Sequence, residues 1–177
     1  MADNIKLKIC SLNVRGIRNQ LKRRKIFYWC KQNHFDIICL QETHLTKEII
    51  SIADRDWNGH CYHSLSNSSY CKGVSIFIKH DFDYKTVSTH CDNEGRKIMI
   101  NISVNNYDIS ITNIYAPTNL NERRNFLQQS KFWTNNNSID NGSIIVTGDF
   151  NSIYNAKDRT SQMIDNSAQN LLDFMNY

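Results

Sequence analysis

The sequence predicts an α/β domain in which helices cover the outer faces of β-sheets. Strand and helix patterns alternate at both ends of the chain, and a series of short β segments lies between them. Hydrophobic residues make up 40% of the 177 residues and charged residues 21%, which is enough apolar material for a buried core. At about 150 residues per domain, this length predicts a single domain over residues 1–177.

The N-terminal part predicts a parallel crossover. Alternating apolar residues in 5–13 indicate a strand, 19–32 has helical spacing, and the apolar run 36–41 is typical of a strand buried on both faces. A strand, a helix and a second strand in this order form a parallel unit. We therefore expect Asn13 and Glu42 to emerge at the same edge of the sheet.

The middle of the chain predicts an antiparallel meander. Turn signals rich in Asn, Asp and Gly separate its β segments, as in hairpins. The expected strands are 73–79, 85–91, 97–105 and 107–113.

The C-terminal part predicts two helices around one more strand. The segment 121–134 is helical, 135–142 is a polar loop, 143–147 is a buried strand, and 168–175 again has helical spacing. The strand leads directly into Gly-Asp-Phe-Asn at 148–151. Helix and strand pairs that flank a meander complete the α/β prediction.

Charge and apolar runs restrict the class of protein. The net charge of +4 favours a polyanionic partner. No apolar run approaches the roughly 18 residues of a membrane span, and the polar start after Met1 does not look like a leader. These features predict an intracellular protein that does not use a membrane.

The six cysteines form no CxxC pair and predict no disulfide framework. The segment His60-Cys61-Tyr62-His63, with Cys71 further on, allows a zinc site as an alternative. Its ligand pairs lack the usual spacing of zinc sites, so ordinary strand residues are the favoured interpretation.

The basic run 22–25 is a candidate for a DNA contact or a nuclear signal. Four consecutive helical residues cannot all face one partner, so a solvated helix face is the favoured interpretation. Arg123-Arg124 is read in the same way.

Polar side chains suited to metal and phosphate chemistry follow the predicted strands. Glu42 comes directly after a buried strand and suits Mg²⁺, a hard cation that keeps most of its waters. Asp149 and Asn151 lie two apart in an expected extended segment, so both should point the same way, one to activate water and one to donate to an oxyanion. Asn13 and Tyr115 follow two other strands. Each residue alone is also an ordinary turn, helix-start or half-buried aromatic residue.

Five motifs together resemble the endonuclease/exonuclease/phosphatase superfamily. They are LNVRGI at 12–17, LQETHL at 40–45, GVSIFI at 73–78, NIYAPT at 113–118 and GDFNSI at 148–153. The strongest likeness is to the endonuclease domain of LINE-type (non-LTR) retrotransposon polyproteins, because His44 follows Gln-Glu-Thr and Ala116-Pro117 follows Asn-Ile-Tyr. Related abasic-site repair enzymes usually carry Lys after Gln-Glu-Thr.

The resemblance implies a four-layered α/β sandwich of two mixed β-sheets flanked by helices, and metal-dependent hydrolysis of a phosphodiester in DNA. Glu42 would hold Mg²⁺, or Mn²⁺, with Asn13 close to the metal and phosphate. Asp149 would orient and deprotonate the attacking water. Asn151 would hydrogen-bond the phosphate and Asp149, and Tyr115 would donate to the phosphate.

Three further residues are expected beside the DNA. The resemblance places His44 near the scissile phosphate and Arg159 in the loop after the catalytic strand. Arg15 stands where many relatives carry Asp or Asn, so it either removes an outer metal ligand or offers a phosphate contact.

The family's last motifs are not found in this sequence. Its members end with strands that carry an Asp and a terminal Ser-Asp-His, but nothing similar follows Asn151, and all six histidines precede that residue. We therefore expect a C-terminally incomplete domain that lacks the last strands. Its sheet edge would be prone to self-association and its activity weakened or absent. The resemblance also implies a longer reverse-transcriptase polyprotein and a nuclear location.

Two other functions stay open. One is an abasic-site DNA endonuclease, or another phosphoesterase of the superfamily that acts on phosphorylated lipids or inositols. The other is a non-catalytic remnant that binds nucleic acid through its basic charge.

Overall fold

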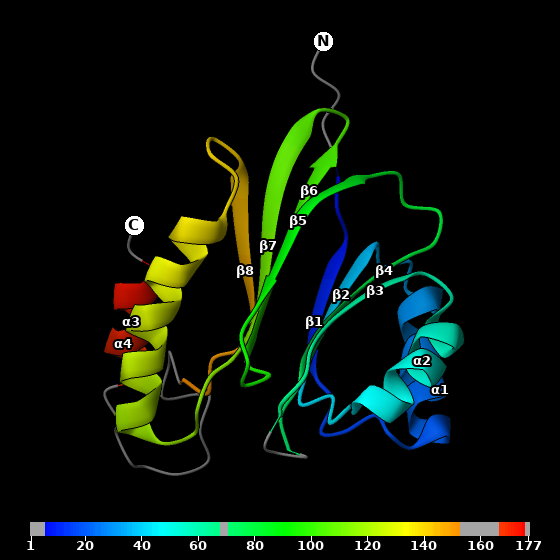
Figure 1. Cartoon of the computed structure of the whole chain (residues 1–177), viewed down its shortest axis with the longest axis horizontal. Helices are drawn as coiled ribbons and strands as arrows, with labels where there is room; N and C mark the ends of the chain where they lie inside the picture. The colour runs from blue at the N-terminus through cyan, green and yellow to red at the C-terminus, as the bar shows by residue number, and fades with distance from the viewer. Residues whose placement is uncertain (1–5, 68–70, 153–166, 176–177) are drawn as a thin grey trace.

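Two four-stranded β-sheets face each other between two pairs of helices in the computed structural model (Figure 1). The structure describes residues 6–67, 71–152 and 167–175. Each sheet contains both parallel and antiparallel neighbours. The predicted four-layered α/β sandwich is confirmed.

The first sheet has the strand order β1-β2-β4-β3. Strands β1 (Ile9–Asn13) and β2 (Ile37–Gln41) are parallel and are connected by α1 (Gln20–Gln32), which confirms the predicted crossover. Strand β4 (Val74–Ile78) runs antiparallel between β2 and β3 (His60–Ser64).

Strand β4 does not belong to the meander, and this corrects the sequence prediction. All five of its residues are buried, so it is a central strand covered on both faces. Helix α2 (Lys47–Trp57) and strand β3 were missed, although Ile49, Ile50 and Ala53 recur at helical spacing. Together they return the chain to the first sheet before the meander begins.

The second sheet has the order β5-β6-β7-β8. Strands β5 (Lys85–Cys91), β6 (Lys97–Val104) and β7 (Tyr107–Tyr115) form the predicted antiparallel meander. Helix α3 (Leu120–Asn137) then crosses over to β8 (Ser143–Asp149), which is parallel to β7. The helix extends three residues into the predicted loop.

Strand β8 is only partly buried, in contrast to the buried strand that its apolar residues predict. It is an edge strand of the described sheet, so Ile144 remains 40% exposed. A cavity of about 430 Å³ lies between β8 and α4 (Ser167–Met175), lined by Gly142, Ile144, Val146, Phe174 and Met175. Self-association through this edge stays a prediction.

Apolar residues fill the three interfaces between the four layers. The central cluster joins the sheets through residues such as Ile76 and Ile100, while Phe27, Trp57 and Phe77 pack α1 and α2 against the first sheet. Leu127 packs with Phe174 on the outer side of the second sheet. Within the described residues, no helix combines the length and apolar character needed to cross a membrane.

The basic run in α1 is not a uniform solvated face. Arg23 is 1% exposed and pairs with Asp56 of α2 at 2.5 Å, and its guanidinium also donates to the carbonyls of Ile17 and Arg18, each at 3.0 Å. Arg24 contacts the same carboxylate from solvent at 2.9 Å. Arg23 therefore fixes the loop between β1 and α1.

Arg123 of α3 is buried as well, with 3% exposure, and donates to the carbonyl of Thr118 at 2.8 Å. Its neighbour Arg124 is exposed. The predicted solvated character therefore holds for one arginine of this pair.

Candidate active site

The strands that carry the candidate residues end at one edge of the sandwich. Strands β1 and β2 are parallel, as are β7 and β8. The C-terminal ends of these four strands lie at the lower edge of the sandwich in Figure 1. Asn13 is in register with Gln41, and Tyr115 with Asp149. The parallel crossovers therefore bring Asn13, Glu42, Tyr115 and Asp149 together from two sheets.

Asn13 links the two carboxylates of the site. Its Nδ2 donates to Glu42 Oε1 and to Asp149 Oδ2, each at 2.7 Å. Its Oδ1 accepts the backbone N–H of Arg15 at 3.1 Å. The amide is thereby fixed between an acid from the first sheet and an acid from the second.

Glu42 is surrounded by polar groups on several sides. Its backbone has a positive φ of +50°, which turns the chain away from β2 directly after Gln41. The Tyr115 hydroxyl hydrogen-bonds to its carboxylate. Burial, together with the charge of Glu42 and this hydrogen bond, raises the pKa of Tyr115 to about 12. The tyrosine is therefore protonated at neutral pH and can donate.

His44 borders the carboxylate of Glu42. Its Nε2 lies 3.7 Å from Glu42 Oε2 and is buried with no hydrogen-bond partner in the described structure. The imidazole hydrogen-bonds to the backbone of Cys71. Burial lowers the pKa of His44 and outweighs the opposite effect of Glu42. A neutral ring with an unused nitrogen thus faces the site.

The loop between β1 and α1 holds His44 in place through two contacts. The Arg18 side chain donates through Nε to the His44 carbonyl. Gly16, with a φ of +83°, packs so closely that a Cβ there would lie 2.8 Å from His44 Nδ1. The LNVRGI motif therefore needs its glycine for this contact.

Asn151 is arranged differently from the sequence prediction. Its φ of +47° places it outside extended backbone, so its side chain does not follow that of Asp149. Its backbone N–H donates to Asp149 Oδ1 at 2.9 Å, while its Nδ2 donates to the carbonyl of Ala116 at 2.7 Å. Asn151 thus contacts Asp149 through its main chain and ties β8 to the segment after β7.

The donor set fits a hard divalent cation. Glu42 and Asp149 supply carboxylate oxygens, the ligands that Mg²⁺ and Mn²⁺ prefer in proteins. The unpartnered His44 Nε2 and the Glu42 oxygen are two electron-pair donors that face each other, an arrangement that positive charge stabilises. Glu42 is therefore the residue best placed to hold an ion.

A buried pair of amide side chains joins β2 to β7 next to the site, and the sequence prediction did not include it. Gln41 Nε2 donates to Asn113 Oδ1 at 2.6 Å. Asn113 Nδ2 donates to the carbonyls of Leu40 and Ser75, each at 3.0 Å, and Asn113 is fully buried. The available signal was an amide between isoleucines in the strand segment Ile-Thr-Asn-Ile-Tyr.

Arg96 is a further residue that the sequence did not indicate. Its guanidinium lies 5.1 Å from the Tyr115 ring centroid and donates to the Tyr115 carbonyl at 3.0 Å. It also lies 3.8 Å from Glu94. Its contact supports the ring whose hydroxyl reaches Glu42.

Of the two remaining predicted contacts, only Arg15 falls within the described residues, and it lies at the margin of the site. Arg15 is exposed on the loop after β1, with a φ of +45°, and its carbonyl accepts from Lys22 at 2.9 Å. Arg159 lies outside the described residues. The structure therefore brings together Asn13, Glu42, His44, Tyr115 and Asp149, with Asn151 beside them.

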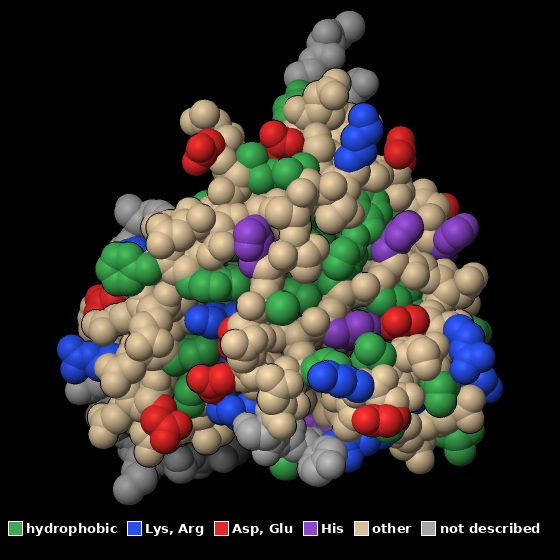
Figure 2. Space-filling view, viewed as in Figure 1, with side chains coloured by type: hydrophobic (Ala, Val, Ile, Leu, Met, Phe, Trp, Pro, Cys, Tyr) green, Lys and Arg blue, Asp and Glu red, His purple; other side chains and the backbone are tan. Residues whose placement is uncertain are grey.

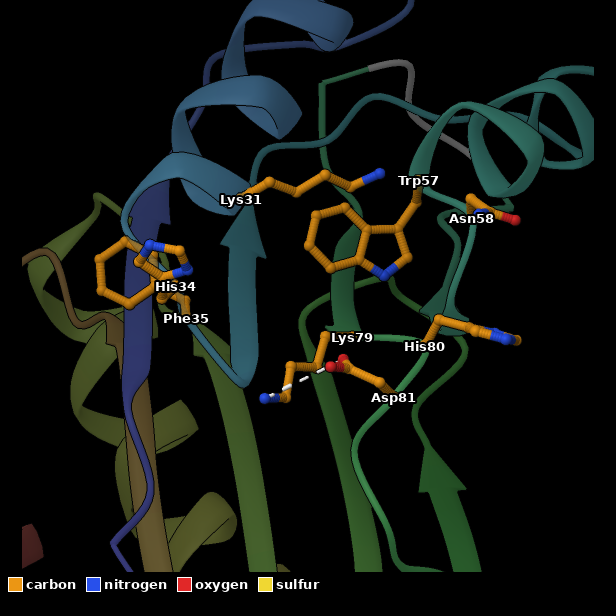
Figure 3. Close-up of a pocket in the computed structure, with 8 residues that line it drawn as sticks. All are labelled: Lys31, His34, Phe35, Trp57, Asn58, Lys79, His80 and Asp81. Carbon is orange, nitrogen blue, oxygen red and sulfur yellow. Dashed lines mark ion pairs between the residues drawn. The ribbon is translucent and has the colours of Figure 1, made fainter.

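Among the described residues, basic side chains form no continuous patch on one face of the molecule (Figure 2). On the face drawn in Figure 2, Lys and Arg alternate with Asp and Glu and do not gather in one patch. A separate cavity of about 320 Å³ is lined partly by Lys31, Trp57 and Lys79 and lies at the opposite end of β2 from Glu42 (Figure 3). Lys79 is paired there with Asp36 at 2.9 Å.

Comparison with known sequences agrees with the motifs. The sequence pattern of the Endonuclease/Exonuclease/phosphatase family matches residues 10–173. The transposon TX1 uncharacterized 149 kDa protein of Xenopus laevis is 26% identical over 166 residues, 94% of this chain and 12% of that protein. An exodeoxyribonuclease of Bacillus subtilis (strain 168) is 26% identical over 114 residues, 63% of this chain and 43% of the enzyme. The chain thus spans less than half the length of either relative.

Solved structures share the fold. An AP endonuclease from Archaeoglobus fulgidus superimposes with a TM-score of 0.72 at 20% identity, over 96% of this chain and 70% of its own. A humanized D. rerio TDP2 superimposes with a TM-score of 0.66 at 16% identity, over 83% of this chain and 67% of its own. The match over residues 10–173, the ordered motifs and the shared sandwich lead to one conclusion: this chain belongs to the Endonuclease/Exonuclease/phosphatase family.

Proposed function

We propose that this chain is a DNA-nicking phosphodiester hydrolase that depends on Mg²⁺, or Mn²⁺ in its place, and that it is the endonuclease part of a retrotransposon protein. The observation that carries the proposal is the bridge from Glu42 through Asn13 to Asp149 at the converging strand ends. The similarity to the transposon TX1 protein over 94% of the chain supports the retrotransposon assignment.

Glu42 is the residue that would hold the cation. A divalent ion bound there supplies positive charge to the anionic phosphodiester. Asn13 keeps Glu42 Oε1 in place, and His44 Nε2 lies on the side of Oε2. This arrangement positions the acid before any substrate arrives, which is how fixed charges favour a transition state.

Asp149 is the group that accepts a proton from the attacking water. The Asn13 amide and the Asn151 backbone N–H each donate to a different oxygen of this carboxylate, at 2.7 and 2.9 Å. Each oxygen keeps a further lone pair for water. The two donors therefore orient the carboxylate without using up its capacity to act as a general base.

Tyr115 is the donor to a phosphate oxygen. Its pKa, raised to about 12, keeps the hydroxyl protonated at neutral pH. In the absence of substrate the hydroxyl bonds to Glu42, and an incoming phosphate oxygen would take over that bond. Arg96 holds the ring from one side, with 5.1 Å between its guanidinium carbon and the ring centroid.

DNA is the substrate that the relatives and the charge favour. A transposon protein and an exodeoxyribonuclease are similar to this chain, and the net charge of +4 suits a polyanion. The transposon relative is far longer than the matched part, which agrees with a longer reverse-transcriptase polyprotein. A DNA substrate of this kind also implies a nuclear location.

Cleavage by residues 1–177 alone is proposed to be slow. The resemblance implies a terminal histidine on the phosphate, whereas all six histidines of residues 1–177 precede Asn151. Losing one stabilising group of this kind costs about 100-fold or more in rate. Soluble imidazole should therefore increase the rate of cleavage.

Nicking of supercoiled plasmid tests the proposal, because a single cut per molecule is detected. We expect slow nicking that needs Mg²⁺ or Mn²⁺ and that is lost in Glu42→Gln. Glu48→Gln is the matched control, because Glu48 is an exposed acid in the first turn of α2 and is not one of the site residues. Nicking that is unchanged in Glu42→Gln would exclude the assigned site.

The same assay separates the alternatives. Cleavage confined to a duplex with an abasic site, or to a small phosphoester, would favour the related hydrolases. DNA binding that weakens with salt, without any metal-dependent cleavage, would favour a non-catalytic remnant.

A further inference from the structure

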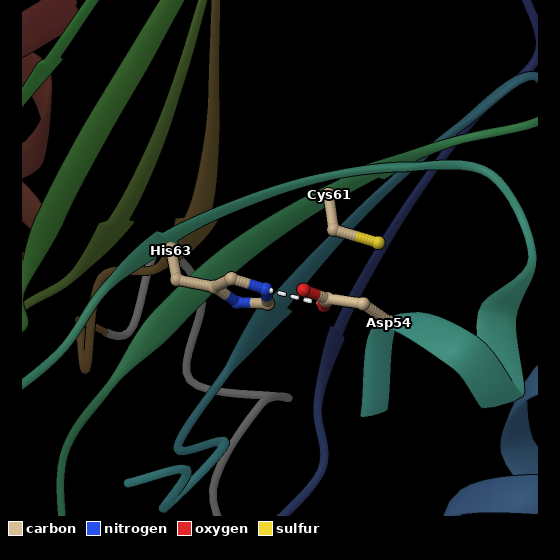
Figure 4. Close-up of side chains that lie close together, drawn as sticks. All are labelled: Asp54, Cys61 and His63. Atoms are coloured by element: carbon tan, nitrogen blue, oxygen red, sulfur yellow. Dashed lines mark hydrogen bonds and ion pairs between the residues drawn. The ribbon is translucent and has the colours of Figure 1, made fainter. Parts of the chain in front are cut away.

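Three side chains of different chemistry converge between α2 and β3, on the helix-covered face of the first sheet. Asp54, Cys61 and His63 each bring one ligand atom, and these atoms lie within 4.8 Å of one another. Figure 4 shows the three side chains pointing toward one another, with Asp54 Oδ1 2.9 Å from His63 Nε2. We call these three residues the Asp54 cluster.

The local fold explains why these residues meet. Cys61 and His63 lie two apart on β3, so both project from the same face of the strand. Asn58, with a φ of +57°, ends α2 and donates its N–H to the Asp54 carbonyl at 2.9 Å. This turn brings the last part of α2 back over β3. The zinc alternative from the sequence paired Cys61 and His63 with His60 and Cys71, which are both exposed.

His63 is oriented by a second hydrogen bond. Its Nδ1 lies 2.8 Å from Oγ of Ser75, which is fully buried on β4. The ring also packs edge-on against Phe77, with 5.5 Å between the centroids. When Nδ1–H donates to Ser75, the lone pair of Nε2 points into the cluster. This is the arrangement in which proteins present histidine to a metal ion.

The charges of the cluster suit a divalent cation. Asp54 is 40% exposed, so the cluster is open to solvent on that side, while His63 is 9% exposed. With Asp54 ionised, Cys61 as a thiolate and His63 neutral, the three ligands carry two negative charges, which one divalent ion neutralises. Nitrogen, sulfur and oxygen together form a donor set that Zn²⁺ accepts, with water as the fourth ligand.

We propose that the Asp54 cluster is a binding site for a borderline divalent cation, with Zn²⁺ as the preferred ion. On binding, the Cys61 thiol releases its proton to solvent and its sulfur bonds to the cation. His63 exchanges the Nε2 proton that bonds Asp54 in the ion-free chain for a proton on Nδ1, through solvent, and contributes the freed Nε2 lone pair. Asp54 contributes one carboxylate oxygen. The bound ion joins α2 to β3 and lies apart from the Glu42 site.

The properties of Cys61 argue against a nucleophile at this position. Burial raises the pKa of the Cys61 thiol, and the negative charge of Asp54 adds to this effect. The thiol is therefore protonated at neutral pH without a cation, and proton release makes cation binding tighter as the pH rises.

Titration with Co²⁺ in the presence of a non-thiol reductant tests the site. A cysteine thiolate bound to Co²⁺ gives a charge-transfer absorption in the near ultraviolet, whereas the oxygen ligands of the Glu42 site do not. We expect one such band per chain, which Zn²⁺ abolishes by displacement. The band should be lost in Cys61→Ser, remain in Cys71→Ser and remain in Glu42→Gln.

Ser75→Ala should weaken Co²⁺ binding by about 10- to 100-fold, because Ser75 orients His63 without touching the ion. Alkylation read by mass spectrometry keeps the test valid if Cys61→Ser does not fold. Zn²⁺ should then protect Cys61 of the wild-type chain and leave the exposed Cys71 reactive. Absence of the band, its survival in Cys61→Ser, or equal alkylation of Cys61 with and without Zn²⁺ would overturn the proposal.

Discussion

Asn13 Nδ2 donates to Asp149 Oδ2 at 2.7 Å across the gap between the two sheets, although the residues are 136 positions apart in the chain. This bond fixes the carboxylate of one sheet relative to the end of the other. The same amide also bonds Glu42, so the two acids share a single donor group. Asn13 is therefore a positioning residue for both.

Replacing Asn13 should reduce cleavage far more than stability. Asn13→Ala removes the donor that holds both acids, and we expect a fall in the nicking rate of about 100-fold. Asn136→Ala, on the exposed surface of α3, is the matched control. Single-turnover nicking measures the effect, and a rate within twofold of wild type would show that the bridge is not needed.

The two arginines that share Asp56 should contribute very differently to stability. Arg23 is buried and holds loop carbonyls as well as the carboxylate, so Arg23→Ala should lower the free energy of unfolding by about 3 to 5 kcal/mol. Arg24 is 60% exposed in its side chain, and Arg24→Ala should cost less than about 1 kcal/mol. Urea unfolding compares them, and equal losses would contradict the structure.

Acid should remove the contribution of Asp56 to stability. Burial alone would raise the pKa of this carboxyl, but hydrogen bonds and charge from Arg23 and Arg24 outweigh burial and lower it. The stabilisation is therefore complete above the unfolded pKa of about 4 and is lost as the pH falls through the lower folded pKa. The difference in unfolding free energy between wild type and Asp56→Asn should shrink below about pH 4. A difference that is constant with pH would rule this out.

The buried amide pair between the sheets should be energetically coupled. Asn113→Ala deprives the carbonyls of Leu40 and Ser75 of a donor, and we expect a loss of about 2 to 3 kcal/mol in the free energy of unfolding. A double-mutant cycle with Gln41→Ala should give a coupling energy of about 1 kcal/mol. Additive effects would mean that the 2.6 Å hydrogen bond from Gln41 to Asn113 contributes nothing to the free energy of unfolding.

Much of the fold could be predicted because its signals are local. The crossover from β1 to β2 follows from periodicity and chain order, and it correctly placed Asn13 next to Glu42. Strand β4 was assigned to the wrong sheet. An apolar run indicates that a strand is buried, but it does not indicate which strands lie on either side of it. Its neighbours are fixed only by packing over long sequence distances.

The candidate site was predictable as a set of residues but not in its geometry. The five motifs identified Glu42, Tyr115 and Asp149, whose positions depend on strand ends. The backbone turn at Asn151 and the partners of Asn113 could not be read from the sequence, because both arise from contacts between segments far apart in the chain.

The most direct test of the proposed hydrolase is the single-turnover nicking rate of Asp149→Asn at saturating Mg²⁺, compared with wild type and Asp108→Asn. Asp108 lies on β7 far from Asp149 in strand register, so its replacement should leave the rate unchanged. Asn at position 149 retains the shape of Asp and loses the proton acceptor, so nicking should fall by at least about 100-fold. Nicking by Asp149→Asn at the wild-type rate would contradict the assignment of Asp149 as the general base.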